Sequence, residues 1–247
     1  MTHQMVHTEN VRRFMFALNE LTSRGVGMEG MGLLWGRPGE GKTSTITYAA
    51  VQGGGLYVRA NAAWRTTAML NALMRELGLQ GPLHAAQMID AVVESLSVTP
   101  RTVYVDEADY LLRDRGHMLD VLRDIYDLSG APVMLIGMEE FAHKLTMLGG
   151  GRFRRRITQW VEFAGLSEQD VRLVVDTVAD VEMSDDLVAH LHRKCEANIG
   201  RVIIGVGRIE SFARANSRDR VTLDDYGART PLFLTDPAFR GARRPTP

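Results

Sequence analysis

A glycine-rich segment at residues 36–43 has the residue types and spacing to bind the phosphates of a nucleotide. It reads G-R-P-G-E-G-K-T and fits the pattern G-x-x-x-x-G-K-[ST] at every fixed position. Glycines let backbone N–H groups converge on a phosphate, and the N-terminus of a following helix adds favourable partial charge. Lys42 can reach the β- and γ-phosphates, and the Thr43 hydroxyl can ligate Mg²⁺. The segment predicts an ATP and Mg²⁺ site made by Gly36, Pro38, Gly39, Glu40, Gly41, Lys42, Thr43 and Ser44.

Two adjacent acids supply the second half of this predicted site. The apolar run Val-Tyr-Val ends in Asp106 and Glu107. An acid at the end of a buried strand can face the metal, so Asp106 joins Thr43 as a predicted Mg²⁺ residue. Glu107 is then placed to polarise the attacking water, and it joins Lys42 as a predicted catalytic residue. The tetrapeptide D-E-A-D at 106–109 also suggests a DEAD-box helicase, but such an enzyme needs a second motor domain, for which the remaining chain is too short.

Alternating strand and helix patterns predict the elements that position these residues. Five apolar runs are expected to be strands, at Met31–Trp35, Leu56–Ala60, Thr102–Asp106, Pro132–Gly137 and Ile157–Phe163. Helical spacing of apolar residues predicts helices at Thr8–Arg24, Lys42–Val51, Thr66–Leu77, His84–Leu96 and Gly116–Leu128. Strands separated by helices indicate a largely parallel α/β sheet. The first, third and fourth strands are continuously apolar, which is typical of central strands, whereas the alternating fifth strand is expected to be peripheral.

The chain changes character after residue 164. Only helical patterns follow, at about 168–180, 185–197 and 201–216, with a possible short turn at Thr222–Tyr226. Ser167 and Asp170 form a helix-start signal. We therefore predict a nucleotide-binding α/β domain over residues 1–164, a helical lid over 165–228, and a proline-rich flexible tail over 229–247.

Composition limits the possible partners and compartment. Lys plus Arg number 29 and Asp plus Glu number 30, so a formal net charge of −1 excludes binding to nucleic acid or membranes by bulk charge. Lysine occurs only at positions 42, 144 and 194, and arginine presents a planar fork suited to phosphates. The single cysteine excludes an intramolecular disulfide. Because neither a membrane helix nor a signal peptide is recognisable, we expect a cytoplasmic protein with no membrane partner.

From Thr8 to about Ala215 the sequence resembles AAA+ ATPases, and within that class the MuB/TnsC/TniB-type ATPases of DNA transposition, with ExeA-like ATPases nearby. The resemblance is carried by the glycine-rich loop, VDEADYL at 105–111, LIGMEEF at 135–141, the arginines of 152–156 and N-I-G-R at 198–201. It implies an AAA+ P-loop NTPase fold, with a five-stranded, mainly parallel sheet flanked by helices and a small C-terminal helical lid.

The resemblance also implies roles for residues outside the two central motifs. Arg201 matches the lid arginine that binds the γ-phosphate. In AAA+ proteins the tip of the fourth strand often carries a polar side chain, the sensor, that contacts the γ-phosphate or the attacking water. Here Gly137 and Met138 occupy this position, and neither side chain can form a strong hydrogen bond. Either Glu139 or Glu140 replaces the sensor, or ATP is hydrolysed slowly and with the help of a partner.

Four arginines between positions 152 and 156 stand where AAA+ assemblies often supply an arginine finger to the ATP of a neighbouring subunit. Arg152 or Arg154 is the expected finger and thus a catalytic residue. A solvated face or a DNA-binding strip are the alternative interpretations of this cluster.

A DNA-binding surface is expected because the resemblance implies ATP-bound filaments on double-stranded DNA. Our candidate is the loop after the second strand, with Arg59, Asn61, Arg65 and Thr66 as the predicted DNA contacts and Trp64 as a packing residue. The implied function is ATP-dependent, sequence-nonspecific DNA binding by a homo-oligomer, either a helical filament or a ring, that delivers target DNA to a transposase. The alternative is an ExeA-like assembly or mechanical ATPase that acts on proteins without binding DNA. A replication initiator or clamp loader would require a larger lid or a winged-helix domain.

Overall fold

The structure is a computed structural model that describes residues 4–25, 27–81, 83–147, 152–228 and 230–232. The chain divides into two compact units. One comprises Glu9–Ala164, and the other comprises Met1–Thr8 together with Gly165–Pro247.

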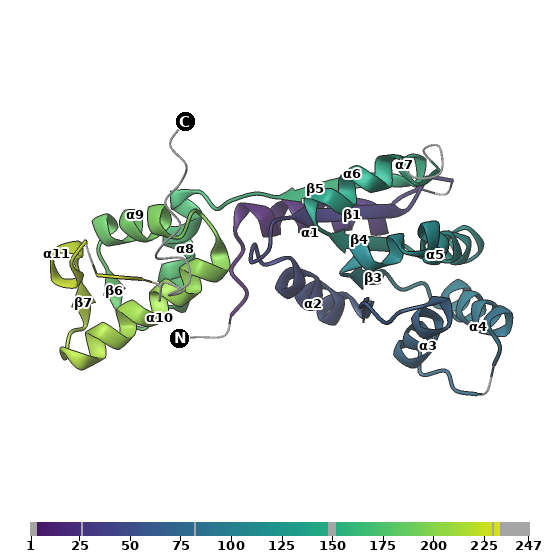
Figure 1. Cartoon of the computed structure of the whole chain (residues 1–247), viewed down its shortest axis with the longest axis horizontal. Helices are drawn as coiled ribbons and strands as arrows, with labels where there is room; N and C mark the ends of the chain where they lie inside the picture. Colours follow the sequence, from purple (N-terminus) through teal and green to yellow (C-terminus); the bar gives the residue numbers. More distant parts are fainter. Residues whose placement is uncertain (1–3, 26, 82, 148–151, 229, 233–247) are drawn as a thin grey trace. The chain divides into compact units, whose positions relative to one another are not determined.

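The first unit is built on a parallel five-stranded sheet (Figure 1). Its strands are β1 (Met31–Gly36), β2 (Leu56–Arg59), β3 (Val103–Asp106), β4 (Val133–Gly137) and β5 (Ile157–Phe163). They lie in the order β2-β3-β4-β1-β5, and every pair is parallel. The three continuously apolar strands are central and β5 is an edge strand, so the predicted placement is confirmed. Because the strands are parallel, the loops that follow β1, β3 and β4 all lie at the same end of the sheet, where the carboxyl ends of the strands meet.

Helices cover both faces of this sheet. They are α1 (Glu9–Thr22), α2 (Lys42–Gly53), α3 (Thr66–Glu76), α4 (Ala85–Val98), α5 (His117–Ser129), α6 (Glu139–Met147) and α7 (Arg152–Arg156), with 3-10 turns η1 (Ala108–Leu112) and η2 (Asp114–Gly116). Tyr104 of β3 packs in one cluster with Phe14 of α1 and Ile46 of α2. Its neighbours Val103 and Val105 pack in a second cluster with α3, α4 and α5. Burial on both faces explains why this strand is apolar at the three positions before Asp106.

Two short helices differ from the sequence expectation. The segment before β5, for which no helix was predicted, contains α7, and α6, also not predicted, starts two residues after β4 ends. Both are short, so the sequence offers less than three turns of periodicity to detect. Phe153 is fully buried and anchors α7, although arginines surround it in the sequence.

The second unit contains α8 (Glu168–Val178), β6 (Glu182–Met183), α9 (Asp185–Lys194), α10 (Ile199–Ala215), β7 (Arg220–Val221) and α11 (Leu223–Tyr226). The expectation of helices alone was wrong, because β6 and β7 pair in parallel. Two-residue strands carry no detectable alternation, and their pairing brings Met183 and Val221 into the core of the unit.

The start of α8 confirms the predicted capping signal. Ser167 Oγ accepts a hydrogen bond from Asp170 N at 3.0 Å, and Asp170 Oδ2 accepts one from Ser167 N at 3.3 Å. Of the predicted tail, residue 229 and residues 233–247 lie outside the described residues. Leu232, within the described part, is buried in the core of this unit. Among the described residues no helix is both long and apolar enough to cross a membrane.

Candidate active site

The glycine-rich loop joins the end of β1 to the start of α2, as the sequence predicts. Gly41 caps α2 with φ 84° and ψ 9°, a left-handed conformation that glycine adopts at little cost. The helix therefore starts at Lys42 with its first N–H groups directed toward the loop. This arrangement is the anion-binding geometry of a helix N-terminus.

Internal hydrogen bonds fix the shape of this loop. Lys42 Nζ donates to Gly36 O at 2.6 Å and to Arg37 O at 2.8 Å. Glu40 Oε2 accepts from Arg37 N at 2.7 Å. Burial lowers the pKa of Lys42, which the nearby Glu40 and Asp106 carboxylates oppose, and burial raises the pKa of Glu40. The loop thus holds an ammonium group among carbonyl oxygens next to a helix N-terminus.

Asp106 lies at the same end of the sheet and is held by three donors. Its Oδ2 accepts from Thr43 Oγ1 at 2.9 Å and from Tyr57 Oη at 3.0 Å, and its Oδ1 accepts from Glu107 N at 2.9 Å. Burial, followed by the charge of Asp106, raises the pKa of Tyr57 to about 12, so this hydroxyl stays protonated as a donor. Tyr57 could not be selected from the sequence, because a tyrosine within a strand is ordinary core and only the β2–β3 pairing brings it to Asp106.

The oxygen set at this position fits Mg²⁺. The Thr43 hydroxyl and the Asp106 carboxylate meet at 2.9 Å, and both are hard oxygen donors of the kind that Mg²⁺ prefers. Within the described ranges, three or more His, Cys, Asp or Glu residues nowhere gather into a metal-binding group.

Glu107 has an unusual backbone and a basic partner. Its φ of 53° and ψ of 38° are left-handed, a conformation that is uncommon for a residue with a side chain. Its Oε1 accepts a hydrogen bond from Arg59 Nη2 at 3.1 Å. Because these side chains are 59% and 38% exposed, the ion pair contributes at most about 1 kcal/mol. One contact thus joins a predicted catalytic residue to a predicted DNA-binding residue.

The backbone at the tip of β4 binds a carboxylate from the turn η1. Met138 N donates to Asp109 Oδ2 at 3.1 Å. Glu139 and Glu140, the expected substitutes for a polar sensor, are exposed in the first turn of α6. Glu140 lies 3.7 Å from Lys144 in an exposed ion pair.

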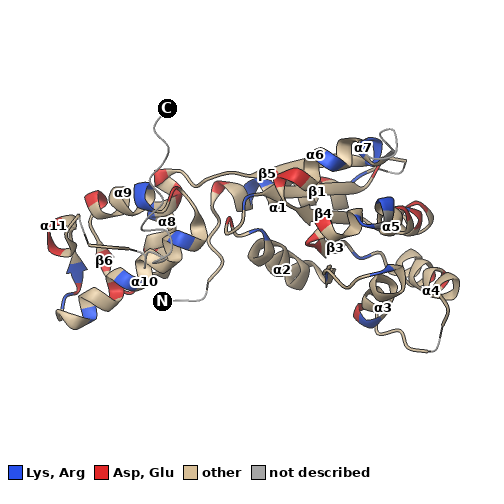
Figure 2. Cartoon of the chain, viewed as in Figure 1, with Lys and Arg blue, Asp and Glu red and all other residues tan. Residues whose placement is uncertain are grey.

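The arginine cluster lies at the opposite end of the strands from the glycine-rich loop. It directly precedes Ile157, which pairs with Met31, whereas the glycine-rich loop follows Gly36, which pairs with Phe163. A full strand of about 20 Å therefore separates the cluster from the loop. The basic residues of α7 appear in blue in Figure 2.

The described side chains of α7 have different surroundings. Arg154 and Arg155 are exposed. Arg156 donates to both carboxylate oxygens of Asp127, at 2.8 Å and 2.7 Å. The side chain of Arg152 lies outside the described part. Arg156 is thus held in a bidentate ion pair, and of the two expected fingers Arg154 is the one whose side chain is described.

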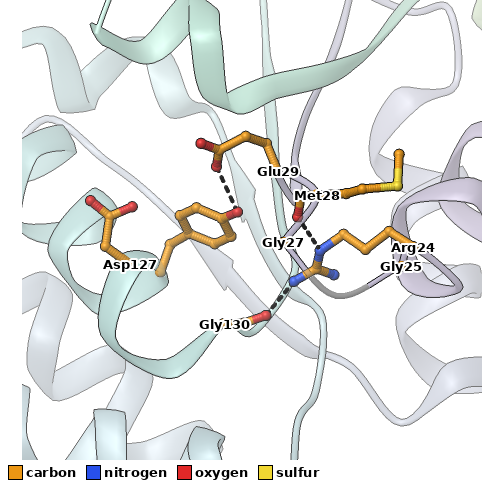
Figure 3. Close-up of a pocket in the computed structure, with 8 residues that line it drawn as sticks. Arg24, Gly25, Gly27, Met28, Glu29, Asp127 and Gly130 are labelled. Atoms are coloured by element: carbon orange, nitrogen blue, oxygen red, sulfur yellow. Dashed lines mark hydrogen bonds between the residues drawn. The ribbon is translucent and has the colours of Figure 1, made fainter.

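Asp127 also lines a pocket near that end, beside Arg24, Glu29 and Tyr126 (Figure 3). Tyr126 Oη donates to Glu29 Oε2 at 2.8 Å and accepts from Gly30 N at 2.7 Å. Arg24 donates to Gly130 O and to Met28 O. These bonds pair the polar groups with one another and tie the chain before β1 to the end of α5.

The predicted DNA-binding loop combines exposed polar residues with a buried anchor. Arg59, Asn61 and Arg65 are exposed, and Thr66 starts α3. Trp64 is 8% exposed, which confirms its packing role. Arg113, which sequence analysis did not select, donates to Ala62 O and adds a second basic segment beside this loop.

Arg201 lies in the second unit at the start of α10. Its Nη1 lies 2.8 Å from Glu196 Oε2, and its backbone N donates to Asn198 Oδ1 at 3.1 Å. Its contact with the γ-phosphate stays a prediction.

Comparison with known proteins supports the fold. Residues 26–145 match a family model described as AAA domain. No curated protein matches this sequence. Among solved structures, Cdc6p from Pyrobaculum aerophilum is similar at a TM-score of 0.67 and 17% identity, over 86% of this chain and 63% of that chain.

Two further structures are similar over most of this chain. The Aeropyrum pernix ORC1 protein in complex with DNA has a TM-score of 0.60 and 20% identity, over 92% of this chain and 66% of that chain. The RuvB Holliday junction branch migration motor of Thermotoga maritima has a TM-score of 0.58 and 18% identity, over 89% and 67%. These similarities confirm the predicted AAA+ P-loop NTPase fold. The narrower resemblance to the MuB/TnsC/TniB type stays a prediction.

Proposed function

We propose that this chain, with an AAA domain at residues 26–145, is an ATP-dependent, sequence-nonspecific DNA-binding ATPase that works as a homo-oligomer. The observation that carries the proposal is the convergence of Lys42, Thr43, Asp106 and Glu107 at one end of the sheet, with Thr43 and Asp106 in contact at 2.9 Å. The chain spans 63% of the length of the Cdc6p structure, and its substrates and partners are therefore proposed from its own site.

Each residue of the site has a defined task in ATP hydrolysis. The N–H groups at the start of α2 and the Lys42 ammonium bind the phosphates, and Thr43 and Asp106 hold Mg²⁺. When bound, the ion neutralises charge on the transferring phosphoryl group. Glu107 accepts a proton from the water that attacks the γ-phosphorus, and the bond to the β-phosphate oxygen breaks to release ADP. Tyr57 keeps the Asp106 carboxylate oriented.

The position of the arginine cluster supports an oligomer. A strand length separates α7 from the glycine-rich loop of the same chain, so an arginine of α7 that reaches a γ-phosphate belongs to the neighbouring subunit. Bound ATP then bridges two subunits, and its hydrolysis weakens the assembly. Filaments and rings both satisfy this geometry.

DNA binding is proposed for the loop that follows β2. Its exposed Arg59, Asn61 and Arg65 suit phosphate contacts without sequence readout. An oligomer repeats these contacts in every subunit, and this repetition provides affinity to a chain with a net charge of −1. Delivery of target DNA to a transposase is proposed from the sequence motifs of the transposition ATPases.

The Arg59–Glu107 pair predicts that DNA controls ATP turnover. An Arg59 guanidinium bound to a DNA phosphate leaves Glu107 free to act on water, so nonspecific duplex DNA should stimulate phosphate release. Substituting Arg59→Ala should raise turnover without DNA about two- to fivefold, the equivalent of an exposed ion pair, and should remove most of the stimulation.

Steady-state phosphate release with and without duplex DNA checks this prediction. Arg75→Ala, an exposed arginine in the last turn of α3, is the matched control and should behave as the wild type. If the wild type hydrolyses ATP without responding to DNA, the protein-directed alternative replaces the DNA-binding one. An Arg59→Ala variant as responsive as the wild type would disprove the coupling.

A further inference from the structure

We propose that Asp109 is the positioning residue that replaces the polar sensor of β4, and that it acts by holding Glu107 in place. The inference rests on the proposed ATPase activity. It assigns a role to the last residue of the D-E-A-D tetrapeptide, which the nucleotide site leaves unused.

Asp109 occupies the space that a side chain on β4 would need. Its Oδ2 accepts a hydrogen bond from Met138 N at 3.1 Å. A Cβ atom added to Gly137 would lie 2.9 Å from Asp109 Oδ2 and 2.5 Å from Phe141 Cδ1, closer than real Cβ atoms approach. The tip of β4 therefore has a glycine because a carboxylate from the β3 side packs against it.

The same contact restrains the backbone of Glu107. Asp109 belongs to η1, and Glu107 is the cap of that turn, with Tyr110 N donating to Glu107 O at 3.1 Å. The left-handed conformation of Glu107 is unfavourable for a residue with a side chain and persists only when its surroundings hold it. Asp106 Oδ1 holds the Glu107 N–H on one side. On the other side, the Asp109–Met138 bond fastens η1 to β4.

Asp109 is also affected by the charges of the phosphate site. Burial raises its pKa, with a further increase from Glu107, whereas the Met138 N–H and Lys42 lower the pKa. Lys42 and Glu107 thus both act electrostatically on Asp109. Glu139 and Glu140, the other carboxylates next to Met138 in the sequence, are exposed on α6.

Two substitutions distinguish the effect of the Asp109–Met138 hydrogen bond from the effect of the negative charge of Asp109. Asp109→Ala removes the acceptor of the Met138 N–H, and a misplaced Glu107 should lower kcat about 10²-fold while KM for ATP changes less than about twofold. Asp109→Asn keeps an oxygen that can accept the same N–H, so kcat should stay within about threefold of the wild type. Glu94→Gln, at an exposed glutamate of α4, is the matched control and should leave both constants unchanged.

Amide hydrogen exchange provides a readout that needs no turnover. In Asp109→Ala the amides of both Met138 and Glu107 should exchange at least about tenfold faster, and in Asp109→Asn neither should change. If the wild type does not hydrolyse ATP, the proposed function fails, and the exchange rates still decide the role of Asp109. Unchanged protection of Glu107 in Asp109→Ala, or loss of kcat in both variants, overturns the inference.

Discussion

Replacing Glu107 with glutamine is expected to lower ATP turnover about 10²–10⁴-fold while ATP binding stays within about twofold of the wild type. Glutamine has nearly the same shape but cannot accept the proton of the attacking water. Lys42, Thr43 and Asp106 remain in place, so the phosphates and Mg²⁺ keep their ligands. Because hydrolysis is proposed to weaken the assembly, the variant should also persist as an ATP-bound oligomer.

Phosphate release and titration with a fluorescent ATP analogue measure the two effects separately. Glu94→Gln is a suitable control because this glutamate is exposed on α4. Normal turnover by the Glu107→Gln variant would show that Glu107, directly after β3, does not activate the attacking water.

Loss of the arginine finger is expected to have the second large effect. Related fingers contribute about 10³–10⁵ in rate, so substituting the correct arginine of α7 with alanine should nearly abolish turnover. Arg152→Ala and Arg154→Ala are the variants to compare. Arg155→Ala, a neighbouring exposed arginine, is the control, and the bidentate Arg156–Asp127 contact makes Arg156 a structural residue.

Mixing two inactive variants tests whether the finger acts between subunits. The finger variant retains Glu107, and the Glu107→Gln variant retains the arginine. Some mixed interfaces combine Glu107 from one variant with the finger arginine from the other. These interfaces have a complete site, so the mixture should recover a measurable fraction of wild-type turnover. A mixture no more active than its components would contradict action in trans.

The sheet was predictable because its signals are long and local. Three apolar runs marked the central strands, and the loop at residues 36–43 predicted the start of α2 at Lys42. The AAA+ fold was predicted from the family resemblance that the glycine-rich loop and the other motifs carry. The strands β6 and β7 were missed because two residues each contain no periodicity, and they form only when residues about 40 apart along the chain pair.

Contacts between strands were the unpredictable part of the site. Tyr57 meets Asp106 because β2 and β3 are neighbours in register, and Asp109 meets Met138 because η1 folds over the tip of β4. The Arg59–Glu107 pair has the same origin, since Arg59 ends β2 and Glu107 directly follows the adjacent strand β3. Residue types at these positions carry no sign of such partners, which arise from sheet order.

Electron micrographs of the wild-type protein with nonspecific duplex DNA test the central claim most directly. The measurement compares a slowly hydrolysed ATP analogue with ADP. We expect ordered oligomers on DNA with the analogue, and few or none with ADP, because bound ATP is proposed to bridge subunits whose arginines act in trans. Single protomers under both conditions, or equal assembly with either nucleotide, would contradict it.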